Sequence, residues 1–260
     1  MVGRRVRAFL GMFGLGSLGV LALVVDGLRD PTIYLELAVE AGISTTVVIV
    51  AAATQTAILL AIAVIVGLVT APRVGFRSHV HAAIPGARAT DRSFRRELHP
   101  AVAIGAAIGG LLIVAEQLPP PAIAEARPTV TATELLASLP LRLLYGGITE
   151  ELLLRWGVMS LLTFALWWLA GGGDRPTGRI VWPAIVAAAI LFGILHLPLA
   201  ATIYGTLTPE VLAFIVGLNA VAGIGFGWLF WRYSLEAAMV AHALAHVIAV
   251  AVWVITLVLA

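Results

Sequence analysis

Ionisable side chains lie deep inside three apolar stretches in the C-terminal half of the chain. They are carboxylates, imidazoles and one guanidinium: Glu150, Glu151, Arg155, His196, His242 and His246. A charge at the centre of a membrane helix costs about 2.5–3.5 kcal/mol on insertion scales. A chain that carries such groups on three separate helices is expected to bring them together in one polar site. Carboxylates and imidazoles that meet in a dry cavity indicate hydrolytic chemistry, in which a glutamate activates water.

The two adjacent glutamates are expected to have different partners. On an α-helix Glu150 and Glu151 point about 100° apart. Arg155 follows Glu151 by four residues, which is the favourable order for an ion pair on one helix face. We therefore expect Arg155 to neutralise Glu151 and leave Glu150 free to act as a base or acid. A structural ion-pair cluster that locks helices together is the alternative for this segment.

The histidines add imidazole groups on two further helices. His196 follows Phe192 by one helical turn, so the phenyl ring can pack against the imidazole and fix its orientation. His242 and His246 are four residues apart, a spacing that suits two ligands of one metal ion. Ala243 stands where the H-E-x-x-H zinc pattern has glutamate, so that pattern is absent. A histidine packed in the helical core is the alternative for His196.

The composition indicates that these stretches lie in a membrane. The 260 residues are 61% hydrophobic and 12% charged, and the mean hydropathy is +1.04. This composition excludes an ordinary soluble domain, and the length suits six to eight membrane helices. We expect an all-α polytopic bundle of about seven transmembrane helices. Residues 1–260 are then a single integral membrane domain.

Two residue types are missing, and each absence excludes a class of chemistry. The chain has no cysteine, which excludes a thiolate nucleophile, a disulfide framework and a cysteine-ligated zinc site. All sixteen basic residues are arginine, which excludes a lysine base or Schiff base. The net charge of +2 does not indicate nucleic-acid binding. Arginine without lysine, together with abundant Ala, Gly and Val, favours a prokaryotic source.

The arginines predict how the helices are oriented. The expected helices cover about 9–25, 43–70, 100–115, 141–170, 181–204, 210–230 and 235–259, and a short interfacial or re-entrant piece is expected within 31–42. Arginines gather in the segments 1–8, 71–99, 171–180 and 231–234. The positive-inside rule places these segments and the N-terminus in the cytoplasm. We expect the loop histidines His79, His81 and His99 to face solvent.

Two glycine pairs could let helices approach closely. Gly105 and Gly109 are spaced four residues apart, as are Gly223 and Gly227. Small residues at this spacing allow membrane helices to pack at short range. We expect these pairs to face other helices of the bundle.

The order of the motifs resembles a known family. Glu-Glu-x-x-x-Arg, then Phe-x-x-x-His, then His-x-x-x-His occur on separate helices, with Gly146 and Gly147 before the first motif and Gly157 after it. This order is similar to the CPBP family of CAAX proteases and bacteriocin-processing enzymes, also called Abi, which are intramembrane endopeptidases. The resemblance covers about 140–255, which would be the catalytic core.

The resemblance implies a role for each site residue. Glu150 would activate water with help from His196, and His242 would stabilise the oxyanion. Glu151 and Arg155 would form the supporting ion pair. The family commonly has Asn where this chain has His246, and His can bind metal as well as donate a hydrogen bond. Zinc held by Glu150, His196, His242 and His246 is therefore an alternative to glutamate-activated water, which requires no cofactor.

The sequence as a whole predicts hydrolysis of a peptide bond at or within the bilayer. The substrate would be a membrane-anchored or hydrophobic peptide or protein, in the manner of CAAX processing. One alternative is a non-catalytic membrane scaffold or immunity protein of the same fold. A transporter or proton relay is another, because intramembrane Glu and His also build those. Inverted repeats and broken helices would favour transport, and neither is evident in the sequence.

Overall fold

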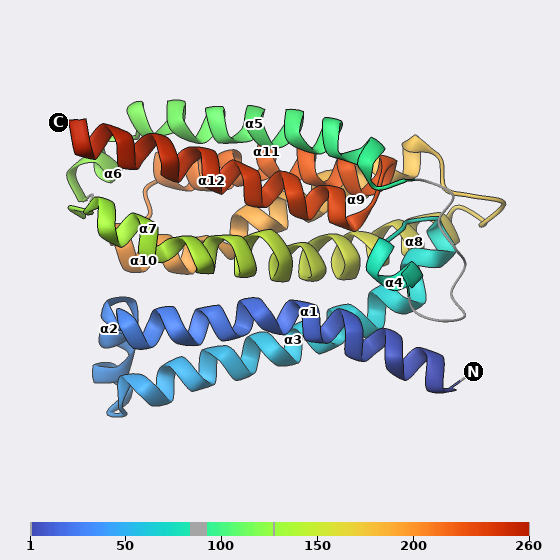
Figure 1. Ribbon diagram of the computed structural model, residues 1–260, viewed down its shortest axis with the longest axis horizontal. Coiled ribbons are helices and arrows are strands. Elements are labelled where there is room, and N and C mark those ends of the chain that lie inside the picture. Colours follow the sequence, from blue (N-terminus) through green and yellow to red (C-terminus); the bar gives the residue numbers. More distant parts are fainter. Residues whose placement is uncertain (1, 84–92, 127, 260) are drawn as a thin grey trace.

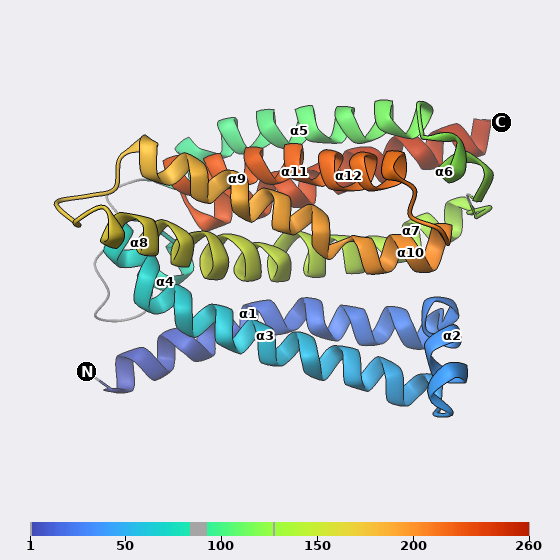
Figure 2. The ribbon, with the colours of Figure 1, turned by 180° about the vertical axis from the view of Figure 1, so that it is seen from behind.

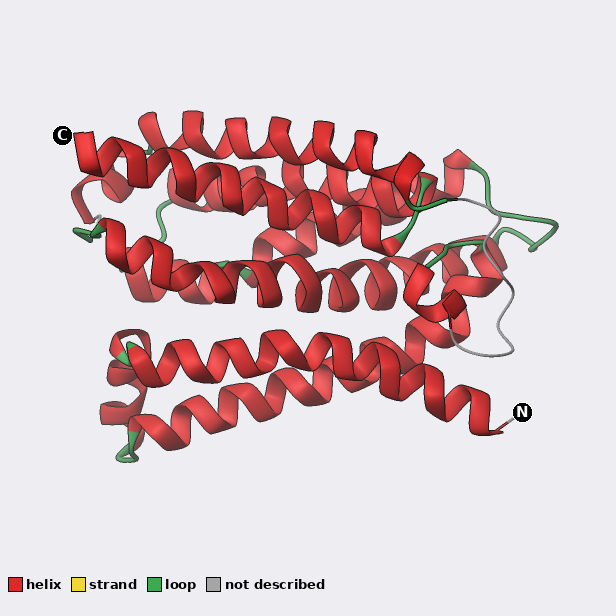
Figure 3. Ribbon diagram, viewed as in Figure 1, coloured by secondary structure: helices red, strands yellow, loops and turns green. Residues whose placement is uncertain are grey.

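Apolar helices make up the described part of the chain. The computed structural model describes residues 2–83, 93–126 and 128–259, so the predicted loop arginines Arg88 and Arg92 lie outside it. Its elements are α1 (Val2–Arg29), α2 (Thr32–Ala41), α3 (Thr45–Val74), α4 (His79–Ala83), α5 (Arg95–Gln117), α6 (Pro121–Ala126), α7 (Ala132–Leu141), η1 (Arg142–Glu150), η2 (Leu152–Met159), α8 (Ser160–Leu169), α9 (Gly178–Leu195), α10 (Leu197–Tyr204), α11 (Pro209–Arg232) and α12 (Leu235–Leu259). Figure 3 shows helices joined by loops, and no strand occurs among these residues.

Seven helical segments of the described chain are long and apolar enough to cross a membrane. The predicted all-α bundle of about seven transmembrane helices is therefore confirmed, and the chain has the fold of an integral membrane protein. The fourth segment differs in extent from the prediction. It runs continuously over Ala132–Leu169, through α7, η1, η2 and α8, instead of beginning near residue 141. The predicted piece within 31–42 is the short helix α2.

The fifth segment differs in a way that bears on the site. It is broken at His196, where α9 ends and α10 begins, whereas the sequence analysis placed His196 well inside one continuous helix. Pro198 follows at the first turn of α10, and proline has no N–H to continue the hydrogen-bond ladder of α9. The prediction of one continuous helix over about 181–204 was therefore wrong at this point.

The helices form two groups on either side of the long fourth segment. In Figures 1 and 2, α1 and α3 run side by side along one flank, and α5, α9, α11 and α12 lie on the other. The fourth segment contacts both groups, because η1 packs on α1 and α12 and η2 packs on α3 and α9. The two glutamates of this segment are thus placed in the middle of the bundle.

Close packing joins α1 to the fourth segment. The Thr149 hydroxyl donates a hydrogen bond to the Gly16 carbonyl of α1 at 2.7 Å. A Cβ atom on Gly19 would overlap the Thr149 Oγ1 atom, so only glycine allows this approach. The contact fixes the residue that directly precedes Glu150.

The glycine pairs lie at helix contacts, as expected. A Cβ atom on Gly105 would come within 2.7 Å of the Ala241 carbonyl oxygen on α12, and α12 is the helix that carries His242. A Cβ atom on Gly223 would come within 2.9 Å of the Ala189 Cβ atom on α9. Small residues therefore bring α12 against α5 and α11 against α9.

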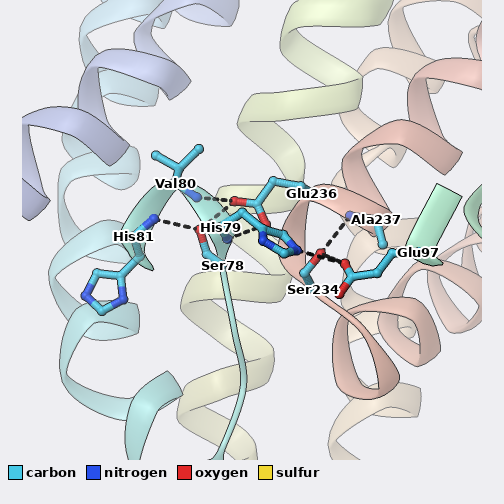
Figure 4. Close-up of polar contacts among 8 residues, drawn as sticks. All are labelled: Ser78, His79, Val80, His81, Glu97, Ser234, Glu236 and Ala237. Carbon is cyan, nitrogen blue, oxygen red and sulfur yellow. Dashed lines mark hydrogen bonds and ion pairs between the residues drawn. The ribbon is translucent and has the colours of Figure 1, made fainter. Parts of the chain in front are cut away.

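A polar cluster holds the beginning of α12 (Figure 4). The Glu236 carboxylate accepts hydrogen bonds from the Ser78 hydroxyl at 2.6 Å and from the backbone N–H groups of His79 and Val80 at 2.9 Å each. Unpaired N–H groups at a helix start are favourable partners for a carboxylate. Glu236 thus ties α12 to the first residues of α4.

A second carboxylate completes this cluster. Glu97 on α5 is buried, accepts a hydrogen bond from the Ser234 hydroxyl, and lies 3.1 Å from the His79 Nε2 atom. The expectation that His79 faces solvent was wrong, because this buried carboxylate holds its ring. His81 is partly buried with its ring 5.7 Å from that of Trp156, and His99 is exposed.

Candidate active site

The two glutamates lie where two wide helical turns meet. Glu150 ends η1 and Glu151 is followed by η2, and both stretches are π-helical. The hydroxyls of Thr149 and Ser160 donate to the carbonyl oxygens five residues earlier, at 3.3 and 3.2 Å. π-Helical turns are rare in proteins, and those that occur are often found at functional sites. A regular α-helix was expected here, because the apolar pattern of the sequence shows that the segment spans the membrane but not how many residues make a turn.

Glu151 is completely buried and holds two partners. Its Oε2 atom lies 3.3 Å from the Arg155 Nε atom, so the expected ion pair is present. Its Oε1 atom lies 2.8 Å from the His242 Nδ1 atom, on another helix. Because an ionised carboxylate can only accept, Nδ1 of His242 carries a hydrogen, and in the neutral imidazole Nε2 is then an acceptor. Glu151 therefore sets both the position and the tautomer of His242.

Arg155 is enclosed by groups that stabilise a buried cation. Its guanidinium lies 4.8 Å from the ring centroid of Phe192 and 5.4 Å from that of Phe226. Cation–π contacts of this kind are stronger in a desolvated site. Its Nη2 atom donates to the Gly223 carbonyl at 3.2 Å. Arg155 thus joins the fourth segment to α9 and α11.

Glu150 is more accessible than its neighbour and faces the imidazole group. Its side chain is 17% exposed, and its Oε2 atom lies 3.9 Å from the His242 Nε2 atom. This distance is too long for a direct hydrogen bond. Both atoms are acceptors when His242 is neutral, so they are complementary to a water molecule that donates one hydrogen to each. The pair can therefore hold and polarise a single water.

Aromatic rings fix His242 from several sides. Its ring stacks on Phe226 with centroids 4.5 Å apart and an interplanar angle of 17°. It also stacks on His246 at 5.1 Å, and Phe192 meets it edge-on at 5.8 Å. The sequence did not indicate a role for Phe226, because it lies among apolar and glycine residues of α11. A ring held in this way has one orientation.

His196 and His246 lie beside this centre. The His196 Nδ1 atom lies 2.7 Å from the Phe192 carbonyl oxygen, and the two rings meet edge-on at 4.7 Å. His196 therefore adjoins the site through Phe192, and no direct contact with Glu150 appears among the described residues. A Cβ atom on Gly146 would lie 3.1 Å from the His246 Nε2 atom and 3.5 Å from the His242 Nε2 atom. Glycine at 146 thus leaves room for both imidazoles.

The four predicted ligands do not fit a metal centre in this arrangement. In the described parts of the chain, no three side chains of His, Cys, Asp or Glu are placed to hold one ion. Glu150 and the His242 Nε2 atom face each other, and the His242 Nδ1 atom is bonded to Glu151, as the second ring nitrogen of a metal-bound histidine also is. A catalytic zinc needs three protein ligands and an open position. Among the described residues, this arrangement supplies no third ligand beside Glu150 and His242.

Comparison with known proteins gives a family match over the helices that carry this site. Residues 132–248 match the family described as type II CAAX prenyl endopeptidase, Rce1-like. The matched segment contains Glu150, His196, His242 and His246, and the resemblance to the CPBP family is confirmed. No curated protein and no solved structure matched the chain. Fold and family together support a CAAX-type intramembrane endopeptidase in general terms.

Proposed function

We propose that this protein is an intramembrane endopeptidase in which Glu150 activates a water molecule. One observation carries the proposal: the Glu150 carboxylate faces the acceptor nitrogen of His242 across 3.9 Å. A water between them would donate to both groups and keep its lone pairs for attack on a carbonyl carbon. The substrate would be a membrane-associated peptide or protein, since the site lies between membrane helices.

The proposed reaction needs only the side chains of this site. The water oxygen attacks the scissile carbonyl carbon while Glu150 takes the water proton as general base. The carbonyl oxygen becomes an oxyanion, and the tetrahedral intermediate then expels the amine as Glu150 returns the proton to its nitrogen. We propose that Glu150 and His242 hold the water, that His246 lines the position of the oxyanion, and that His196 supports the site through Phe192.

The buried ion pair would support this chemistry without taking part in it. Glu151 accepts from the His242 Nδ1 atom, which keeps the His242 Nε2 atom directed at Glu150. If His242 gains a proton during the reaction, the negative charge of Glu151 compensates it. Arg155 and Phe192 hold Glu151 and the imidazoles in place, which is the supporting role proposed for them.

The test measures peptide hydrolysis by purified protein in which the Glu150 carboxylate has been replaced. A fluorogenic, farnesylated CaaX peptide and a non-prenylated copy would be offered to the wild type, Glu150→Gln and Glu40→Gln. Glu40 is exposed on α2 and serves as the matched control. Loss of a general base lowers the rate by about 10²–10⁴-fold. Full activity of Glu150→Gln would disprove the mechanism, and flux through proteoliposomes without hydrolysis would favour a transporter.

Metal content is measured on the same preparation. The proposed reaction requires no cofactor, so elemental analysis should find no stoichiometric zinc in active protein, and chelator treatment should leave its activity unchanged. Strict loss of activity with a chelator, restored by zinc, would make it a metalloprotease instead.

We also propose a membrane orientation and a domain organisation. Arginines gather in the segments 1–8, 71–99, 171–180 and 231–234. By the positive-inside rule, these segments and the N-terminus would lie in the cytoplasm, and the cell would be prokaryotic. Residues 1–260 would form one membrane domain with a catalytic core at about 140–255. Labelling of single cysteines from each side of the membrane would test the orientation, because the chain has no cysteine of its own.

A further inference from the structure

One arginine inside the fourth membrane span takes no part in the centre formed by Glu150 and His242. Arg142 is the first residue of η1, and it lies partly buried, ten residues after the start of the span Ala132–Leu169. A charged side chain within a membrane span is costly, so such groups are paired or mark a functional site. The surroundings of the Arg142 guanidinium therefore indicate what it binds.

The described residues use only one nitrogen of this guanidinium. Its Nε atom donates to the Ser138 hydroxyl at 3.0 Å, one turn earlier on the same segment. Among the described residues, its Nη groups have no hydrogen bond and no carboxylate lies within 4.0 Å of it. The carboxylates of Asp26 and Glu116 attract it from farther away, and Asp26 is paired with Arg29 at 2.8 Å. The Nη groups are thus available to an anionic ligand.

A second donor without an acceptor lies beside this arginine. The Arg142 guanidinium lies 6.0 Å from the centroid of the Trp253 ring on α12. The indole N–H of Trp253 is buried and has no hydrogen-bond partner in the part of the chain that the structure describes. A buried donor that lacks an acceptor is unfavourable, and a buried tryptophan usually finds one. A carboxylate has two acceptor oxygens, so one such group can accept from both side chains.

Arg142 and the proposed catalytic groups lie along the same contact, where η1 packs on α12. One turn after Arg142, a Cβ atom on Gly146 would lie 3.1 Å from the His246 Nε2 atom. On α12, Trp253 follows His246 by seven residues, which is two turns on the same face. Arg142 precedes Glu150 by eight residues, or about 12 Å along a helix, and about three to four extended residues span that length. A peptide bound at Arg142 can therefore reach Glu150.

We propose that Arg142, with the indole N–H of Trp253 beside it, binds the C-terminal carboxylate of the substrate. The inference rests on the proposed function for the kind of ligand, a peptide, and adds the part of that peptide which is recognised. Arginine binds a carboxylate through two parallel hydrogen bonds. An internal segment of a protein offers no such group, so Arg142 would select chain ends and place the attacked bond near them.

Peptide binding by the Glu150→Gln protein tests the proposal separately from hydrolysis. The probe is a farnesylated CaaX peptide that carries a fluorophore at its N-terminal end and ends in either a carboxylate or an amide. Fluorescence anisotropy in a neutral detergent gives each Kd. The carboxylate peptide should bind about tenfold or more tightly than the amide peptide, because only the carboxylate forms hydrogen bonds between charged groups.

Adding Arg142→Gln to this protein should abolish the difference between the two peptides and leave the Kd of the amide peptide unchanged. Arg179→Gln is the matched control, since Arg179 is an exposed arginine at the beginning of α9. Trp253→Phe keeps an aromatic ring and removes the N–H, so it should raise the Kd of the carboxylate peptide alone. The Trp253 variant decides the question if Arg142→Gln does not fold, which gel filtration would reveal.

Each outcome supports or overturns the proposal. Equal affinity of the Glu150→Gln protein for the two peptides would overturn it, and so would a preference for the carboxylate that persists in Arg142→Gln or in Trp253→Phe. An equal loss of preference in Arg179→Gln would also overturn it, because the effect would then follow overall charge. A carboxylate preference that depends on Arg142, in a protein whose wild type hydrolyses neither peptide, would uphold this binding site and overturn the proposed hydrolysis instead.

Discussion

Replacing Arg155 with methionine would leave the Glu151 carboxylate buried without its guanidinium. Both side chains are almost completely buried, and their ion pair is 3.3 Å long. Breaking a buried pair by removing one partner costs about 3–5 kcal/mol, because the remaining charge is uncompensated. Loss of the guanidinium contacts with Phe192 and Phe226 adds to this cost. We therefore expect Arg155→Met to be among the most destabilising substitutions in the chain.

The assay compares this variant with a second one that also removes the negative charge. Glu151→Gln keeps a carbonyl oxygen that can accept from the His242 Nδ1 atom. In the double variant Glu151→Gln/Arg155→Met no uncompensated charge remains, so its destabilisation should be smaller than the sum of the single effects by about 0.5–3 kcal/mol. Tryptophan fluorescence during denaturant titration in detergent measures each free energy of unfolding, with Arg179→Met as an exposed control. Additive single effects, or a cost below about 1 kcal/mol for Arg155→Met, would refute the assignment of a buried ion pair.

Two further predictions concern the imidazole groups. Gly146→Ala would place a methyl carbon 3.1 Å from the His246 Nε2 atom, and peptide hydrolysis should fall about tenfold or more because the imidazoles must shift; an unchanged rate would contradict the proposed site. Burial, and next the charge of Arg4, lower the pKa of His81 below 6.5, against the opposing charge of Glu236. The neutral ring is therefore favoured in the folded state, and stability present above pH 6.5 is lost as the pH falls. His81→Gln should flatten this acid-side decline of the unfolding temperature, and an unchanged slope would contradict it.

The membrane helices could be predicted because each is a long apolar stretch bounded by charged or turn-forming residues. The ion pair between Glu151 and Arg155 could also be predicted, since it depends on four-residue spacing within one helix. The wide turns around Glu150 could not, because they are accompanied by contacts with distant residues, such as the Thr149 hydrogen bond to Gly16. A local pattern of apolar residues cannot predict contacts between residues that are far apart in the sequence.

Signals for two other features were present but weaker. Pro198, two residues after His196, indicates the helix end that the structure shows there. The cluster around Glu236 joins residues more than 150 positions apart, as in the hydrogen bond from Ser78 to Glu236. These hydrogen bonds depend on how α4, α5 and α12 pack together, and a single sequence does not reveal that packing.

The wide turns of η1 and η2 make the number of residues in this segment as important as their identity. Removing one residue between Arg142 and Thr149 would rotate the rest of the helix relative to α1 by the share of a turn that one residue occupies. Glu150 would then turn away from His242 even though every side chain of the motif were still present. Deletions and insertions within this stretch are therefore expected to abolish the site as completely as replacing its glutamate.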